Sequence, residues 1–121
     1  MSQDPSALQT PRGKLVERRR NLAPQQAEAF AAFNRAVFAD GALPAKTKQL
    51  IALAVAHVTQ CPQCIRGHTT AAARQGATPQ EIMEAIWVAT EMRAGGAYAH
   101  ALLALDALEG EGGNSGPKEV A

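Results

Sequence analysis

The chain has 121 residues and a mass of 12.7 kDa, enough for one domain with a modest core. Its 12 Lys and Arg against 11 Asp and Glu argue against nucleic acid or an anionic membrane as the main partner. The 26 alanines, set against five aromatic residues and ten Val and Ile, favour helices over strands. We therefore expect an all-α fold.

The first 20 residues are predicted to form an N-terminal arm that is only partly helical. Residues 1–13 contain prolines and a glycine and show little periodic pattern. A cluster of basic residues is interpreted as a solvated helix face, with a nuclear-localisation or nucleic-acid-binding patch as the alternative: Arg12, Lys14, Arg18, Arg19 and Arg20. The first residues show neither the charged nor the apolar segment of a secretory signal, so we expect a cytoplasmic protein.

Residues 21–109 are predicted to form a single helical domain. Pro24 suits a first helical position and Gly41 an end, and the apolar stripe between them is interpreted as core or subunit contact: Phe30, Phe33, Val37 and Phe38. The following helix, residues 45–59, is apolar all round after its first turns, which predicts a place at the centre of the domain.

Clear start and stop signals divide the rest of the chain. Thr78 and Glu81 form a capping box around Pro79, which predicts the start of a helix. The predicted segments are a helix over residues 62–75 closed by Gly76, a helix from residue 79 broken at Gly95–Gly96, a last helix over residues 97–108, and a disordered tail over residues 110–121. The inward stripe of the helix from residue 79 is expected to be Ile82, Ile86, Ala89 and Met92.

Alanine makes a thin core, because each methyl group buries little area at about 25 cal/mol per Å². Small helical subunits with that deficit often recover burial by associating. We therefore expect a homo-oligomer.

The chemistry is concentrated in residues 61–68, Cys-Pro-Gln-Cys-Ile-Arg-Gly-His. Pro62 suits a first helical position, so Cys61 is the predicted N-cap and Cys64 lies in the first turn, where backbone N–H groups and the helix dipole stabilise a thiolate. Cysteines three apart on a helix need only a small adjustment to form a disulfide. His68 lies one turn after Cys64, where it can take the thiol proton.

Other interpretations of this segment stay open. Both cysteines could be inert core residues. With His57 and His68 they supply four possible zinc ligands, although the two histidines fall on separate predicted helices. A thioredoxin-like oxidoreductase fits the cysteine spacing but needs strands that the composition does not supply.

The cysteine motif and its flanking segments resemble the AhpD-like alkylhydroperoxidases of the carboxymuconolactone decarboxylase superfamily. The resemblance covers roughly residues 24–108, and its landmarks are residues 44–56, 61–68, 76–82 and 92–96. It implies an AhpD-like bundle of about five to six helices, assembled as a trimer or hexamer. Decarboxylases of this family lack the cysteine pair, so the pair places the chain with the peroxidase-like members.

The resemblance implies that Cys64 is the peroxide-attacking thiolate, Cys61 the resolving cysteine and His68 a member of the proton relay. The glutamate of that relay, twelve residues before the first cysteine, is replaced here by Gln49, whose amide does not accept a proton as a carboxylate does. Position 63, a histidine in some members, is also glutamine. Candidates to replace the missing acid are Glu84, Glu91 or a water chain past His57, and His100 could also line the site; each of these residues also has a plain surface or core interpretation.

Together these features predict a thiol-dependent hydroperoxide reductase that uses a hydroperoxide and an external dithiol, without metal, flavin or haem. One alternative is a general disulfide oxidoreductase. Another is a non-catalytic oligomeric protein in which the cysteines and histidine form a redox sensor or a zinc site.

Overall fold

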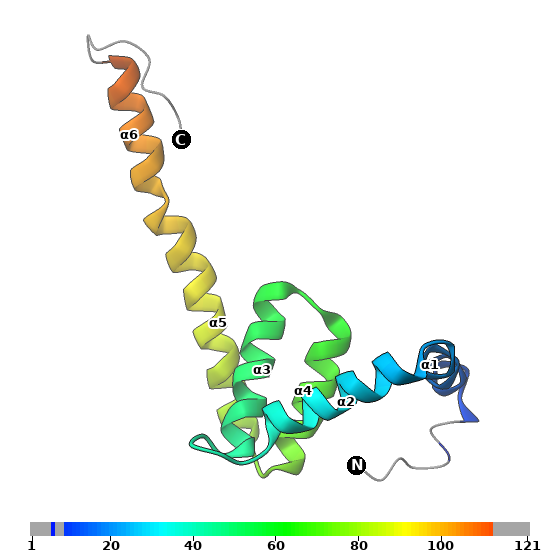
Figure 1. The fold of residues 1–121 in the computed structure, drawn as a ribbon. Helices are drawn as coiled ribbons and strands as arrows, with labels where there is room; N and C mark the ends of the chain where they lie inside the picture. The colour runs from blue at the N-terminus through cyan, green and yellow to red at the C-terminus, as the bar shows by residue number, and fades with distance from the viewer. Residues whose placement is uncertain (1–5, 7–8, 113–121) are drawn as a thin grey trace. The chain divides into compact units, whose positions relative to one another are not determined.

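A computed structural model describes residue 6 and residues 9–112, and all regular secondary structure in them is helical (Figure 1). The elements are α1 (Pro11–Leu22), α2 (Pro24–Phe38), α3 (Ala45–Thr59), α4 (Pro62–Arg74), α5 (Pro79–Ala99) and α6 (Ala101–Gly112). The predicted all-α fold is confirmed. Within this described part of the chain, no helix is both long and apolar enough to cross a membrane. The chain divides into two units, residues 1–41 and 42–121.

The first unit contains α1 and α2, neither of which has a buried residue. Thr10 caps α1 by accepting the N–H of Gly13 on its Oγ1 at 2.9 Å, and Pro11 takes the first helical position. The helix accommodates this proline because a first-turn proline lacks only an N–H that has no partner within the helix. The described part of the predicted arm is helical from Pro11 onward.

Helix α2 begins at Pro24, as predicted. Two members of its apolar stripe, Phe30 and Phe33, have rings 6.3 Å apart yet are 69% and 63% exposed. Within its own unit the stripe is therefore not a core.

Helix α3 is the centre of the second unit, because it packs against both α4 and α5. Its Leu53 is completely buried. The other buried side chains among the described residues are all alanines: Ala45, Ala56, Ala72, Ala77 and Ala89. The predicted central position of this helix is confirmed, and its core is as thin as the composition indicates.

Two residues connect α3 to α4. Gln60 adopts the left-handed conformation (φ 58°, ψ 48°), and its N–H bonds the carbonyl oxygen of Ala56. The N–H of Cys61 reaches the same carbonyl at 3.2 Å. Cys61 is then the N-cap of α4, with Pro62 at the first helical position, as predicted. This short connection holds the start of α4 next to the end of α3.

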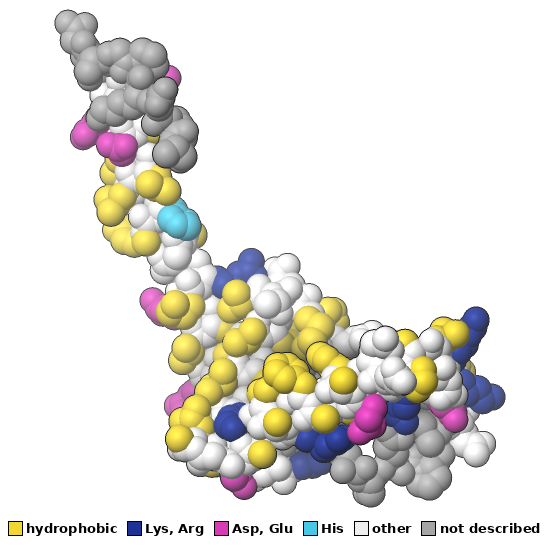
Figure 2. Space-filling model, viewed as in Figure 1, with side chains coloured by type: hydrophobic (Ala, Val, Ile, Leu, Met, Phe, Trp, Pro, Cys, Tyr) yellow, Lys and Arg dark blue, Asp and Glu magenta, His cyan; other side chains and the backbone are white. Residues whose placement is uncertain are grey.

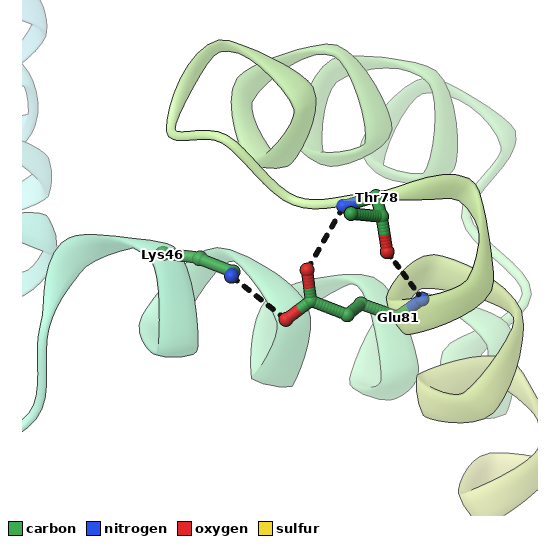
Figure 3. A network of polar contacts seen from close by, with 3 residues as sticks. All are labelled: Lys46, Thr78 and Glu81. Carbon is green, nitrogen blue, oxygen red and sulfur yellow. Dashed lines mark hydrogen bonds and ion pairs between the residues drawn. The ribbon is translucent and has the colours of Figure 1, made fainter.

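A polar network joins the start of α5 to the start of α3 (Figure 3). The Oγ1 of Thr78 accepts the N–H of Glu81 at 3.1 Å, and the Glu81 Oε1 accepts the N–H of Thr78 at 3.0 Å. The predicted capping box is confirmed. In addition, the Nζ of Lys46 lies 2.7 Å from the Glu81 Oε2, so the box is tied to the first turns of α3.

Helix α5 continues through Gly95 and Gly96 to Ala99, so the predicted break at the two glycines is wrong. A glycine inside a helix costs only about 0.5–1 kcal/mol relative to alanine, which a long helix tolerates. The interruption falls instead at His100. Of the expected inward stripe, Ala89 is buried and Met92 is 63% exposed.

Helix α6 ends at Gly112, so residues 110–112 of the predicted disordered tail are helical. The rest of that tail, residues 113–121, lies outside the described residues. Among the helices that the structure describes, α6 contacts only α5.

The Glu81 network makes a prediction about pH. The hydrogen bond from Lys46, and then that from the Thr78 N–H, hold the pKa of Glu81 below its ordinary value of 4.5. A carboxyl whose pKa is lower in the folded state stabilises that state above the unfolded pKa, and this contribution is lost as the pH falls through the folded pKa.

Glu81→Gln should therefore lower the free energy of unfolding at neutral pH, and its difference from wild type should shrink below about pH 4.5. Urea unfolding at a series of pH values measures this difference. Glu84→Gln, at an exposed position of the same helix, is the matched control and should show a smaller difference at neutral pH. A Glu81→Gln difference that stays constant down to about pH 3 would contradict the assignment.

Candidate active site

Cys61 and Cys64 form a disulfide at the start of α4, with their Cα atoms 5.2 Å apart. As the N-cap, Cys61 accepts the N–H of Cys64 on its Sγ at 3.3 Å. Both residues are half-buried, so neither is sealed inside the core. The disulfide expected from the spacing of the two cysteines is present.

The start of α4 favours a thiolate once the disulfide is reduced. The first turn of α4 contains no acidic residue whose charge would repel a cysteine thiolate. The N–H groups of the first turn and the positive end of the helix dipole both stabilise an anion there. A thiolate, and not the thiol, is the nucleophile in peroxide reduction and in disulfide exchange.

A hydrogen bond between His68 on α4 and Gln49 on α3 links the two helices. The His68 Nδ1 lies 2.8 Å from the Gln49 Oε1, and both residues are half-buried. An amide oxygen only accepts, so His68 donates its Nδ1–H. In the neutral ring the nitrogen that accepts a proton is then Nε2. Gln49 therefore sets both the orientation and the tautomer of the imidazole.

The other histidine of the proposed zinc set is engaged within its own helix. His57 donates its Nδ1–H to the carbonyl oxygen of Leu53 at 2.8 Å. In the part of the chain that the structure describes, no group of three or more His, Cys, Asp or Glu side chains is placed to hold a metal ion.

The candidates for a replacement acid lie elsewhere on the second unit. Glu84 and Glu91 are exposed on α5. His100 lies in an apolar groove between α3 and α5, whose lining includes neither cysteine. The acceptor of the His68 Nδ1–H is Gln49, the position that the resemblance indicated.

Two contacts were missed from the sequence. The bond from the Cys64 N–H to the Cys61 Sγ follows the rule that an N-cap side chain accepts from the third residue of its helix, so the predicted N-cap already contained the signal. The ion pair between Lys46 and Glu81 had no local signal, because its partners are far apart in the sequence.

The sequence and the fold both resemble those of known proteins. The sequence model of the carboxymuconolactone decarboxylase family matches residues 24–107. A Paracoccus denitrificans protein, "Uncharacterized protein 4 in cox locus", is 67% identical over 82 residues, which are 68% of this chain and 74% of that protein.

Two crystal structures have a similar fold. A carboxymuconolactone decarboxylase family protein from Legionella pneumophila has a TM-score of 0.64 and 35% identity, covering 79% of this chain and 86% of that one. A protein from Methanobacterium thermoautotrophicum also has a TM-score of 0.64, with 36% identity, covering 69% of this chain and 93% of that one. With a family match from the start of α2 into α6, and a cysteine pair that fits the AhpD-like members, the chain belongs to the carboxymuconolactone decarboxylase family.

Proposed function

We propose that the chain is a thiol-dependent hydroperoxide reductase. The observation that carries the proposal is the Cys61–Cys64 disulfide at a helix N-terminus, with an oriented imidazole, that of His68, one turn further along the same helix. A disulfide between neighbouring cysteines is the oxidised end state of such a cycle. The family match supports this assignment.

The cycle balances with residues of this chain, a hydroperoxide and an external dithiol. The Cys64 thiolate attacks the O–O bond; an S–O bond forms, the O–O bond breaks, and the leaving alkoxide takes a proton to become an alcohol. The Cys61 thiol then attacks the sulfenic sulfur, and the hydroxyl leaves as water with the Cys61 proton. The external dithiol reduces the new disulfide by exchange and becomes a disulfide itself.

His68 is the proton carrier of this scheme. Its Nε2 takes the Cys64 thiol proton and returns one to the leaving alkoxide. Gln49 holds the ring in place but adds no negative charge beside the imidazolium. Because turnover consumes a reduced dithiol, the proposal also places the protein in the reducing cytoplasm.

A second candidate function rests on the hydrogen bond from the Cys64 N–H to the Cys61 Sγ. The N–H of Cys64 points at the Cys61 Sγ, so a thiolate is stabilised at Cys61 by a backbone donor. A chain that used Cys61 as its nucleophile would be a general disulfide oxidoreductase without a preference for peroxide.

Single-cysteine variants distinguish the two functions. In Cys61→Ser, the remaining Cys64 should form a sulfenic acid with one equivalent of peroxide, because its nucleophile and base are intact. In Cys64→Ser, Cys61 should react more slowly, because it lies a full turn further from His68. Dimedone trapping with mass spectrometry measures both rates, and faster oxidation at Cys61 would favour the second candidate.

The role of Gln49 is tested by restoring the charge. Gln49→Glu should raise the rate of peroxide-dependent Cys64 oxidation near neutral pH by about tenfold, because a carboxylate beside the imidazolium is worth roughly 1–2 kcal/mol. His68→Ala should lower that rate. Stopped-flow oxidation of the reduced proteins measures both effects.

Gln80→Glu is the matched control, since it makes the same substitution at an exposed position of α5 and should leave the rate unchanged. A neutral or slower Gln49→Glu protein with wild-type helicity would show that the relay uses another group or that the natural reaction is not peroxide reduction.

A further inference from the structure

An apolar groove with a volume of about 570 Å³ lies between α3 and α5. Hydrophobic side chains line both of its walls, and four of the large ones are exposed: Val55, Val58, Val88 and Met92. Figure 2 shows hydrophobic side chains on the surface along α5. A volume of this size is typical of sites that take a small, mostly apolar molecule.

The groove changes in character along α5. The first residues that α5 contributes to its lining are apolar, namely Val88, Ala89 and Met92. Further along the helix the lining includes Arg93 and His100, and the described residues of the lining include no acid. The groove therefore has an apolar end and a cationic end.

Helix α5 extends beyond α3 at the cationic end. The ion pair of Lys46 with Glu81 holds the starts of the two helices together, and Val58, in the last turn of α3, lines the groove. At about 1.5 Å per residue, α3 runs about 20 Å from Lys46 to Thr59, whereas α5 runs about 28 Å from Glu81 to His100. The wall that α3 provides thus ends before the groove reaches His100.

A molecule with an apolar chain and an anionic head matches this arrangement. Its chain would cover the exposed valines and Met92, which removes apolar surface from water. The guanidinium of Arg93 always carries a positive charge and holds a carboxylate by two parallel hydrogen bonds, and the imidazole of His100 has a further N–H to donate. One fixed positive charge in the described lining matches a head with a single negative charge.

We propose that this groove binds a fatty acid, with the alkyl chain between α3 and α5 and the carboxylate at Arg93 and His100. The lining of the groove includes neither Cys61, Cys64 nor His68, so this site is separate from the redox pair. It does not depend on the proposed reaction.

Titration calorimetry of the full chain with decanoate, below its micelle concentration, tests the ligand. Decanoate should bind at one molecule per chain and at least about tenfold more tightly than decanol, which has the same chain without the charge. Octanoate, which is two methylene groups shorter, should bind about tenfold more weakly than decanoate. Decyltrimethylammonium, whose charge is opposite, should bind more weakly than decanol.

A charge deletion tests the head-group site. Arg93→Gln should weaken decanoate binding about tenfold and leave decanol binding unchanged, because only the carboxylate uses the guanidinium. Arg74→Gln is the matched control, since Arg74 is exposed on α4 outside the groove, and it should bind both ligands as wild type does. An equal loss of both ligands in Arg93→Gln, with wild-type helicity, would contradict the assignment.

A steric block tests the chain site. A Cβ added at Gly96, which lines the groove, would meet no atom within 4 Å, so Gly96→Leu should keep its helicity while the new side chain takes up space in the groove. Its affinity for decanoate and for decanol should fall at least about tenfold. Gly67→Leu, at a helical glycine outside the groove that also has open space, is the matched control. Circular dichroism measures helicity.

Four outcomes would overturn the proposal. Three of them are decanol that binds as tightly as decanoate, Arg93→Gln that binds decanoate no more weakly than Arg74→Gln, and Gly96→Leu that binds decanoate like wild type. The fourth is the absence of saturable decanoate binding, which is expected if a second copy of the chain fills the groove; sedimentation velocity measures that association. Charge-selective binding that both Arg93→Gln and Gly96→Leu weaken supports the proposal.

Discussion

The close approach of α3 to α4 and α5 is the constraint on which the rest of the structure depends. Apart from Leu53, the buried side chains of the described second unit are alanines, which bring helices together without filling much space. Because the helices that face each other carry short side chains at their contacts, longer polar side chains beside those contacts can reach across and form hydrogen bonds. The arrangement loses hydrophobic burial, since each alanine removes little area from water.

The pairing of Gln49 with His68 shows what the close approach permits. At 2.8 Å, a half-buried amide on α3 orients an imidazole on α4 without bringing a second charge into the interface. A carboxylate at position 49 would be more costly to desolvate but would stabilise the imidazolium directly. In the relay that we propose, Gln49 thus orients the imidazole but supplies no charge that would stabilise the imidazolium.

Local chemistry made much of this fold and site predictable. Residues 45–59, the N-cap Cys61 and the capping box at Thr78 were predicted correctly, because each depends on residues within about one turn of the helix. The break at Gly95–Gly96 was not, because a rule based on glycine alone ignores the cooperativity of the long helix around it. Contacts between distant residues, such as that of Lys46 with Glu81, leave no mark in a single sequence.

Periodicity also cannot say what covers an apolar face. Met92 continues the stripe of Ile86 and Ala89, yet it is exposed, because α3 leaves a groove there instead of closing it. The same groove includes Val55 and Val58, in the last turns of α3 before the turn to Cys61. In that turn Gln60 and Cys61 both donate their N–H groups to the carbonyl oxygen of Ala56, so the end of α3 that borders the groove also fixes the start of α4.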